Sequence, residues 1–440
     1  MLSKFLYNLF LVLYSIGIRI ASLWNPKAQK WLNGRKNIFA TINSKLQTPP
    51  APGGTKPIWM HCASLGEFEQ GRPLLEALKA EDPGQKIILT FFSPSGYEVM
   101  KDYKGADHVF YLPMDSASNA KKFLDAVNPS LVLWVKYEYW FYYLTALKQR
   151  NVPTVLVSGI FRKHQPFFAW YGQIWREMLA TFTQFFVQNE ESKKLLSTLG
   201  FTSNVSINGD TRFDRVLEIA GKFIPVPHIA GFCGDSPVIV AGSTWEEDEI
   251  ELLHFVNVHP DIKFIIAPHE IDEENLKDVK DEFPRSIFYS ELVKISTDNG
   301  QRTPDNPQGP ADEQFSPPNV LIIDNVGMLS RLYYYATIAY VGGGFGSDGV
   351  HNVLEAAVYG KPVVYGPVYE KFEEAIGLLN AGGGLSIDGP INLDSTMINL
   401  LNDDKNRTER GKAALQFVHA HAGATKKIIQ FIQEKRLLTS

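Results

Sequence analysis

A glycine-rich stretch in the C-terminal third of the chain has the residue types of a phosphate-binding loop. An apolar run at residues 337–341 is typical of a buried strand. It ends at the glycines of residues 342–344, and a helix is expected to open near His351 or Asn352. Glycines let backbone N–H groups approach a ligand closely, and a helix start adds partial positive charge. Glu355 falls in the first helical turn, where a carboxylate can accept hydrogen bonds from ribose hydroxyls. A strand-to-helix turn without any ligand has the same composition, so both interpretations stay open.

A second group of chemically capable residues follows the first expected strand, at residues 58–61. Ser64 can cap the next helix, Gly66 permits the close approach of another group, and Glu67 stands near the helix start. A carboxylate in that position can act as a general base. The spacing from Ser64 to Glu67 is also that of a capping box, in which the carboxylate only satisfies the helix start.

Two later loops carry further candidates. Glu138 follows an expected strand at residues 130–135 and can hold a ligand or orient other groups, although a solvated carboxylate at a helix start looks the same. Arg212 follows an expected strand at residues 204–208 and can face a phosphate or a sugar carboxylate. Its alternative is a surface ion pair with a neighbouring aspartate.

Short apolar runs alternate with amphipathic stretches, which predicts parallel sheets covered on both faces by helices. A single helix is expected at residues 165–181, and residues 296–319 are polar and proline-rich, typical of a disordered excursion. The expected strands are residues 58–61, 86–92, 108–112, 130–135, 153–158, 184–188, 204–208, 238–241, 264–267, 337–341 and 362–365.

The order of these elements predicts two Rossmann-like α/β domains that face a cleft, the glycosyltransferase-B architecture, with ligands at the carboxyl ends of both sheets. The chain has 440 residues, enough for about two domains of ordinary size. The predicted parts are an anchor helix with its flank at residues 1–43, a linker at 44–57, an N-terminal domain at 58–222, an interdomain linker at 223–237 and a C-terminal domain at 238–440.

The N-terminal segment has the composition of a membrane anchor. Residues 5–23 are nearly all apolar apart from Asn8 and Arg19, and the first 66 residues contain eight Lys and Arg but no Asp or Glu. A length of about 20 residues can just span a bilayer, whereas Arg19 equally permits a helix that lies in the membrane interface. An ordinary buried helix is the third interpretation. The Pro/Gly-rich linker predicts that the chain folds without residues 1 to about 50.

Cysteine usage and overall composition limit the class of protein. Cys62 and Cys233 are the two cysteines of the sequence, which argues against a disulfide framework and for a reducing compartment. Hydrophobic residues make up 45% and charged residues 21% of the chain, as in a globular protein.

Several motifs in one order resemble the 3-deoxy-D-manno-octulosonic acid (Kdo) transferases of lipopolysaccharide synthesis. The motifs are HCASLGEFEQGRPLLEAL, VQNEESKKLLSTLG, GDTRFD, AGSTWEEDE, GGGFG and GVHNVLEAAVYGKPVVYGP. The resemblance implies an inverting transfer of Kdo from CMP-Kdo to the glucosamine disaccharide of a lipid A precursor. It also implies an N-terminal acceptor domain, a C-terminal CMP-sugar domain and a place on the cytoplasmic face of the inner membrane, anchored by the N-terminal helix. We expect no nucleic acid among the partners.

The resemblance also implies roles for individual residues. Glu67 matches the general base. Glu138 matches a carboxylate of the family, although the local motif here is YEYW, and Arg212 matches a position where many relatives have Lys and would stabilise the transition state. The expected contacts of CMP are Pro268, His269, Val326, Gly327, Met328, Asn352, Val353, Leu354 and Glu355.

The chain departs from the family pattern in two loops. Relatives commonly have an Arg-His pair where this chain has residues 267–270, and often Met-Gly-Glu where it has residues 326–328. The side-chain contacts expected from these loops therefore differ from those of relatives.

The chemistry of an inverting transfer fits these residues. It needs one carboxylate to take the acceptor proton and a cationic pocket for the departing phosphate. The sequence has no Asp-x-Asp motif, so we expect neither a bridging metal nor another cofactor. The alternatives are another nucleotide-sugar enzyme of this fold, a transferase or a 2-epimerase, and a non-catalytic, membrane-tethered nucleotide-binding module.

Overall fold

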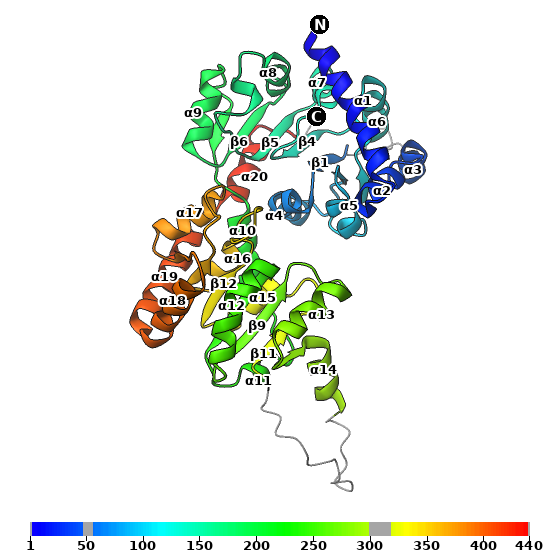
Figure 1. Ribbon diagram of the computed structural model, residues 1–440. Helices are drawn as coiled ribbons and strands as arrows, with labels where there is room; N and C mark the ends of the chain where they lie inside the picture. The colour runs from blue at the N-terminus through cyan, green and yellow to red at the C-terminus, as the bar shows by residue number, and fades with distance from the viewer. Residues whose placement is uncertain (1, 47–55, 299–317, 439–440) are drawn as a thin grey trace. The chain divides into compact units, whose positions relative to one another are not determined.

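The computed structural model describes residues 2–46, 56–298 and 318–438, which form two compact units. Unit 1 comprises residues 1–215 together with 421–440, and unit 2 comprises residues 216–420. Each unit contains a seven-stranded sheet with helices packed against it (Figure 1). All strand pairs in both sheets are parallel, which confirms the predicted α/β class with two Rossmann-like domains.

The sheet of unit 1 has the strand order β3-β2-β1-β4-β5-β6-β7. Its strands are β1 (Ile58–Cys62), β2 (Ile87–Phe91), β3 (His108–Tyr111), β4 (Leu131–Val135), β5 (Thr154–Gly159), β6 (Gln184–Val187) and β7 (Val205–Ile207), all at predicted positions. The strand order reverses between β1 and β4, which pair directly. The loops after these two strands therefore meet at the carboxyl edge, the usual ligand position in such sheets.

The helices of unit 1 cover both faces of this sheet because alternate strand residues point to opposite sides. Trp59 joins one hydrophobic core, whereas Ile58 and Met60 join the other. The helices are α1 (Leu2–Ala21), α2 (Pro26–Asn33), α3 (Ile38–Lys45), α4 (Leu65–Glu81), α5 (Pro94–Met100), α6 (Ala117–Val127), α7 (Phe141–Gln149), α8 (Gln173–Leu179), α9 (Glu190–Thr198), α10 (Arg212–Gly221), which continues into unit 2, and α20 (Ala424–Glu434).

The C-terminal helix α20 returns to unit 1, whereas the sequence assigned the whole C-terminal part to the second domain. Ile428, Ile429 and Ile432 are buried in the same core as β1 and α4. The carboxylate of Asp214 accepts hydrogen bonds from the N–H groups of Gly423 and Thr425, 2.5 and 2.7 Å away. The amphipathic pattern of α20 does not reveal which sheet its apolar stripe covers.

Unit 2 has the strand order β10-β11-β9-β8-β12-β13-β14. Its strands are β8 (Val238–Thr244), β9 (Lys263–Pro268), β10 (Ser286–Phe288), β11 (Val320–Ile322), β12 (Ile338–Val341), β13 (Val363–Tyr365) and β14 (Gly384–Ser386). Its helices are α11 (Ile229–Cys233), α12 (Glu246–Val258), α13 (Glu273–Glu282), α14 (Tyr289–Asp298), α15 (Leu329–Leu332), α16 (Leu354–Ala357), α17 (Glu373–Asn380), α18 (Pro390–Asn402) and α19 (Asp404–His421). The short strands β10, β11 and β14 were not predicted.

Two predicted segments have a different structure. Residues 223–237, expected to be an interdomain linker, contain helix α11 and pack on unit 2, where Val226 and Ile229 are buried. The single helix expected at residues 165–181 is a 3₁₀ turn at Pro166–Phe168 followed by α8. A side chain at Gly172 would meet the carbonyl oxygen of Pro166, so this glycine permits the tight turn between them. Most of the predicted linker at 44–57 and of the excursion at 296–319 lies outside the described residues.

The N-terminal helices α1, α2 and α3 pack against unit 1. On α1, the Tyr7 hydroxyl donates a hydrogen bond to the Asp115 carboxylate over 2.7 Å, and Leu11 is buried. Trp31 on α2 and Ile42 on α3 belong to the same core as the sheet residues. These contacts make the segment part of unit 1, whereas the sequence analysis treated it as separate from the folded body; that the chain folds without it stays a prediction.

A half-buried arginine fixes this segment to the sheet. The Arg35 guanidinium lies 3.9 Å from the Trp31 ring centroid and 4.8 Å from those of Phe92 and Tyr111. It also donates hydrogen bonds to the carbonyl oxygens of Leu112 and Phe92, at 3.0 and 2.7 Å. Burial lowers the pKa of Arg35 to about 10, so the side chain remains charged at neutral pH.

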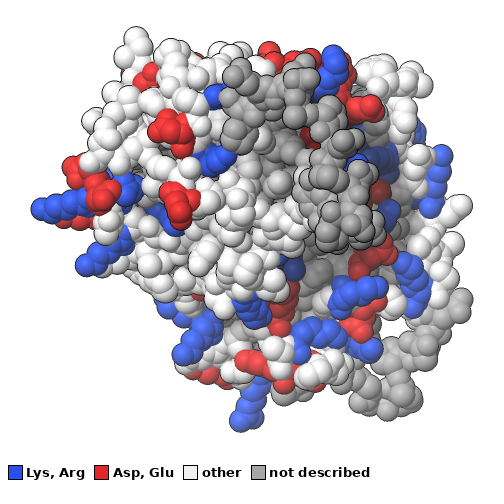
Figure 2. All heavy atoms as spheres, turned by 90° about the horizontal axis from the view of Figure 1, so that it is seen from below, with Lys and Arg blue, Asp and Glu red and all other residues white. Residues whose placement is uncertain are grey.

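The opposite face of α1 is exposed and apolar. By length and composition, Ser3–Ala21 could cross a membrane, and 6% of this window is buried. The exposed apolar residues of the helix are Phe5, Leu6, Leu9, Phe10, Val12, Leu13, Ile16 and Ile20. By comparison, acidic and basic side chains are interspersed on the face of the molecule shown in Figure 2. An apolar helix face of this size is typical of a site of membrane or protein contact.

We predict that Trp31→Ala destabilises the protein by about 3–5 kcal/mol, because it empties a buried aromatic site. Trp24→Ala, at a position 69% exposed on the same segment, is the matched control and should change stability by less than about 0.5 kcal/mol. Urea unfolding of the full chain measures both. Equal midpoints for the parent and Trp31→Ala would show that the segment does not contribute to folding.

Candidate active site

Glu67 lies near the start of α4 and is 7% exposed. One carboxylate oxygen accepts a short hydrogen bond from the backbone N–H of Ala63, and the other accepts one from the N–H of Tyr137 over 3.3 Å. The Ser64 side chain makes no capping bond, so the reciprocal bond of a capping box is missing. Glu67 instead joins the loop after β1 to the loop after β4.

Burial raises the pKa of Glu67 to about 7. The hydrogen bond from Ala63 opposes this shift, the negative charge of Glu138 adds to it, and the charge of Lys136 opposes it. A carboxylate with a pKa near the operating pH is suited to general-base work, because it is available for a proton and holds it firmly.

Glu138 lies close enough to Glu67 to affect its ionisation, and it faces a buried histidine. The Glu138 carboxylate accepts a hydrogen bond from the Trp140 indole N–H over 3.2 Å. It is 3.9 Å from His61 Nε2, a buried atom without a closer partner among the described residues. His61 Nδ1 lies 2.9 Å from the Thr90 hydroxyl. The sequence reasoning did not assign His61, although it is the first residue of the HCASLGE motif.

Arg212 is paired with a buried aspartate. Its Nε and Nη2 donate to Asp210 Oδ2 over 2.9 and 2.8 Å, and Gln70 on α4 donates to the same oxygen over 2.9 Å. Burial alone would raise the pKa of Asp210, but Arg212 and then Lys136 lower it below its usual value. The ion pair weighed in the sequence analysis therefore exists. The pair also holds the Arg212 guanidinium beside α4, because Gln70, three residues after Glu67 on that helix, binds the same Asp210 oxygen.

Lys136 connects these groups electrostatically and was not predicted from the sequence. Its positive charge lowers the pKa of both Glu67 and Asp210. Its backbone is in the left-handed region, with φ of 58°, directly before Tyr137, whose N–H group binds Glu67. Unit 1 thus brings together a buried proton acceptor, a second carboxylate and two cations at the carboxyl edge of its sheet.

In unit 2, the glycines after β12 make close contacts with other parts of the backbone. A Cβ atom on Gly342 would lie 2.4 Å from the Ser243 carbonyl oxygen, and one on Gly344 would lie 2.5 Å from the Gly366 nitrogen. The N–H of Gly343 donates to the buried carboxylate of Asp248 over 2.7 Å. Glycine is therefore required here by packing, and one amide of the loop is already bound to protein.

The helix after this loop is shorter than predicted. It begins at Leu354 and has four residues, so it is too short to bring a strong helix dipole to a phosphate. Glu355 does lie in the first turn, where its Oε1 accepts a hydrogen bond from Asn352 Nδ2 over 3.1 Å. Val353 and Leu354 are fully buried, so contacts from these two residues to a ligand would come from their backbone.

His269 is part of an aromatic stack that the sequence did not reveal. Its ring centroid lies 4.5 Å from those of Trp245 and His351. Trp245 Nε1 donates a hydrogen bond to His351 Nε2 over 2.9 Å. Burial lowers the pKa of His351 to about 4, so at neutral pH the ring proton lies on Nδ1. Trp245 belongs to the AGSTWEEDE motif, which was the available signal.

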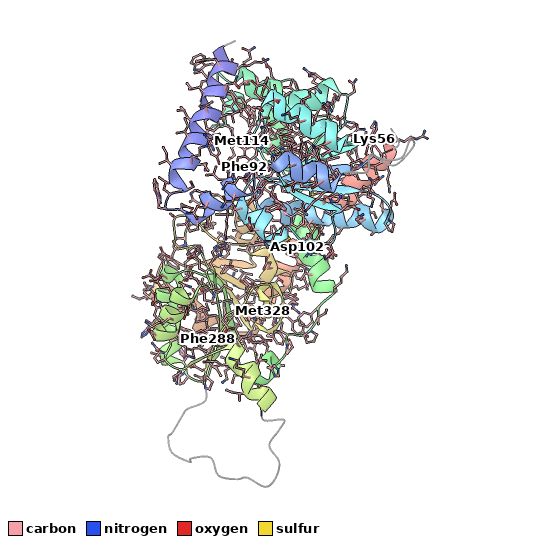
Figure 3. All side chains as sticks on the ribbon, turned by 90° about the vertical axis from the view of Figure 1, so that its right-hand side faces the viewer. Lys56, Phe92, Asp102, Met114, Phe288 and Met328 are labelled. Carbon is pink, nitrogen blue, oxygen red and sulfur yellow. The ribbon has the colours of Figure 1, made fainter. Side chains whose placement is uncertain are left out.

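The remaining predicted nucleotide contacts lie after β9 and β11. Pro268 ends β9, Val326 is 84% exposed, Gly327 has φ of 92° and Met328 is buried. A cavity of about 460 Å³ lies near these loops and is lined by Ile271, Glu273, Leu276, Lys277, Lys280, Phe288 and Asp324. Phe288 and Met328 are labelled in Figure 3. None of the predicted CMP contacts lines this cavity.

We predict that the stability of the protein falls as the pH rises from about 4.5 to about 7, in part because of Glu67. In this window the folded protein holds a proton on Glu67 that the unfolded chain has lost, so rising pH favours unfolding. Glu67→Gln cannot titrate. Relative to the parent, its free energy of unfolding should therefore increase by about 2–3 kcal/mol across the window. Urea unfolding at several pH values measures this, and parallel pH profiles would contradict the burial of an ionisable Glu67.

The comparisons with known proteins bear on both units. Residues 36–215, which include Glu67, Glu138 and Arg212, match the family model described as 3-deoxy-D-manno-octulosonic-acid transferase (kdotransferase). The chain is 27% identical to a 3-deoxy-D-manno-octulosonic acid transferase of Bordetella pertussis, over 94% of this chain and 95% of the relative. It is 26% identical to that of Haemophilus influenzae, over 96% and 95%.

Among solved structures, the chain is similar to the UDP-GlcNAc 2-epimerase of Neisseria meningitidis bound to UDP-GlcNAc. The TM-score is 0.60 at 16% identity, over 86% of this chain and all of that one. At this identity the likeness shows the shared two-domain, glycosyltransferase-B-like fold alone. The resemblance predicted from the motifs is confirmed: the chain is similar over most of its length to Kdo transferases, and residues 36–215 match the model of that glycosyltransferase family.

Proposed function

We propose that this protein is an inverting glycosyltransferase that moves Kdo from CMP-Kdo to the glucosamine disaccharide of a lipid A precursor. The observation that supports this most is Glu67: a buried carboxylate with a pKa of about 7, held by two backbone N–H groups at the carboxyl edge of unit 1. Its position inside the region matched by the family model agrees with a role as the general base.

The proposed step needs one proton acceptor and one leaving group. An acceptor hydroxyl oxygen attacks the anomeric carbon of Kdo, the bond from that carbon to the CMP phosphate oxygen breaks, and Glu67 takes the hydroxyl proton. CMP departs with the electron pair of the broken bond. Because the attack comes from the side opposite the leaving group, the anomeric configuration inverts. Glu138, held by the Trp140 indole, is proposed to orient the acceptor or Glu67.

We propose that Arg212 stabilises the negative charge of the departing phosphate. Its ion pair with Asp210 fixes the guanidinium beside the helix that carries Glu67, and arginine matches phosphate geometry. CMP is proposed to contact Pro268, His269, residues 326–328 and residues 352–355. The reaction as proposed uses no metal or other cofactor, since the leaving group carries a single phosphate that cationic side chains can neutralise.

We propose that the protein lies on the cytoplasmic face of the inner membrane, where its lipid acceptor would be. The exposed apolar face of α1 supports membrane contact, and the inner face of the same helix packs on unit 1 through Tyr7 and Leu11. A helix with one face on protein and one apolar face outward is suited to lie in the membrane interface rather than to span the bilayer.

We predict that Glu67→Gln retains its fold and near-normal CMP affinity but transfers Kdo at least about a hundredfold more slowly, because an amide cannot hold the acceptor proton. In the parent, kcat/KM should rise with pH and level off above about 7, where Glu67 is ionised. Glu69→Gln, the same change on α4 at a side chain paired with Arg72, is the matched control. Transfer by Glu67→Gln within a few-fold of the parent would refute the assignment of the base and make Glu138 the next candidate.

We predict that Glu355→Ala weakens CMP binding about tenfold to a hundredfold, the loss expected for one hydrogen bond to a charged group. Isothermal titration calorimetry with CMP measures it. Glu373→Ala, at the exposed start of α17, is the control for a lost carboxylate elsewhere in unit 2. An unchanged affinity for CMP would remove Glu355 from the ribose site.

The donor itself separates this proposal from the alternatives. Mass spectrometry of products formed from CMP-Kdo and a lipid A precursor should show Kdo attached to the lipid. A 2-epimerase would instead convert a UDP-sugar without any acceptor, and a non-catalytic module would bind CMP without product.

A further inference from the structure

Unit 1 contains a cavity of about 740 Å³ that the proposed transfer step does not use. It lies between α1, residues 31–40 of α2, α3 and their connecting loop, and the loop that follows β3. Arg19, Arg35, Lys36, Trp31 and Met114 are among the residues that line it, and Figure 3 labels Met114. The volume falls within the range of sites that hold small molecules.

The charged residues that line the cavity are all cationic. Arg35 donates its hydrogen bonds to backbone carbonyl oxygens, those of Trp31, Phe92 and Leu112. Within the described part of the chain, no carboxylate lies within ion-pair distance of Arg19, Arg35 or Lys36. Arg35 is half-buried, and the charge of Glu138, which raises its pKa, acts from beyond ion-pair distance, so an anion that enters this cavity gains a charge-assisted interaction with Arg35.

A buried hydrogen-bond donor in the cavity wall also lacks a partner. Trp31 is 6% exposed, and no acceptor for its indole N–H lies within hydrogen-bond distance among the described residues. Buried tryptophan N–H groups usually have an acceptor. The Asn37 and Asn119 side chains add polar groups to the same wall. The indole N–H without an acceptor and the three cations without a carboxylate at ion-pair distance both indicate a ligand with negatively charged oxygen atoms.

The rim of the cavity on α1 is continuous with the exposed apolar face of that helix. Ser15 and Arg19 line the cavity, and the exposed residues Val12 and Ile16 lie three positions before them, one turn away on the same side of the helix. Trp31, Phe39 and Met114 supply apolar wall within the cavity. A ligand that fits both parts has an anionic head and an apolar tail.

We propose that this cavity binds the phosphate head of a membrane lipid, with the lipid chains lying along the apolar face of α1. A phosphate monoester has oxygen atoms for both arginines and for the Trp31 N–H, and arginine matches phosphate geometry through paired N–H donors. A site of this kind would hold α1 in the membrane interface at a fixed depth. It adds lipid selectivity to the non-selective contact that an apolar helix face supplies by itself.

The test is the binding of the full chain to phosphatidylcholine vesicles with and without phosphatidic acid, measured by co-sedimentation without sugar donor. Phosphatidic acid should strengthen binding. The double variant Arg19→Gln/Lys36→Gln changes exposed residues of the cavity. The control Lys27→Gln/Lys30→Gln removes the same charge from exposed positions of α2 outside it. The affinity of the cavity variant for phosphatidic acid vesicles should fall at least about tenfold more than that of the control. This is the loss expected when one hydrogen bond between charged groups is removed.

Equal losses in the two double variants would overturn the proposal, because they would show attraction by net charge alone. Trp31→Phe adds an uncharged test: it removes the indole N–H and keeps an aromatic ring beside Arg35. This variant should bind phosphatidic acid vesicles about twofold to tenfold more weakly, with unchanged binding to pure phosphatidylcholine. An unchanged affinity for both vesicles in a folded Trp31→Phe would contradict a phosphate in the cavity.

Inorganic phosphate distinguishes a lipid head from free phosphate. If the lipid is the ligand, phosphate should displace the protein from phosphatidic acid vesicles no more than chloride of the same ionic strength. Full displacement by phosphate but not by chloride would overturn the lipid assignment. Because these assays contain no CMP-Kdo, their failure would leave the proposed transfer reaction untouched.

Discussion

The bond of the Glu67 carboxylate to two backbone N–H groups determines the geometry of the edge where unit 1 would do chemistry. Burying a carboxylate is costly unless hydrogen bonds replace its water. Ala63 and Tyr137 provide those bonds from the loops after β1 and β4, which are adjacent because the two strands pair. The same carboxylate therefore joins the two loops and remains a proton acceptor.

The residues around Glu67 depend on that arrangement. The Trp134 indole N–H donates to the backbone oxygen of Glu138 over 2.5 Å, which fixes the loop that also contains Lys136 and Tyr137. The left-handed backbone of Lys136 is a conformation that non-glycine residues rarely adopt, and it persists where surrounding contacts enforce it. The strain lies directly beside the N–H group that holds Glu67.

The sequence predicted the fold better than it predicted the packing between parts. Seven strand positions of unit 1 were read correctly because apolar runs bounded by turns have a clear period. Strands β10, β11 and β14 were missed, although β7 and β13 have the same length of three residues and were predicted. The return of α20 to unit 1 and the packing of α1 could not be read either, since a hydrophobic stripe indicates burial but not the partner that covers it.

The candidate site was predicted where residue type alone limits the chemistry. Glu67 was recognised as a carboxylate at a helix start after a buried strand, but its raised pKa depends on burial and on Glu138, which are tertiary features. His61, Lys136 and Trp245 were missed because each has an ordinary structural role in most proteins. The hydrogen bond from Trp245 to His351 joins residues 106 positions apart, and no local pattern reveals such a pair.

The glycine-rich loop shows how one pattern can have a cause other than the expected one. Its spacing suggested amides aimed at a phosphate, yet Gly342 and Gly344 are needed because neighbouring loops pass too close for a side chain, and the Gly343 amide binds Asp248. Asp248 also accepts hydrogen bonds from the Tyr340 hydroxyl and from the backbone N–H of Trp245. It therefore fixes the start of α12 against the end of β12. The loop is thus a rigid support that places Trp245 beside His351. With the Nε2 atom of His351 engaged as an acceptor, the polar group of that ring left to donate is Nδ1–H.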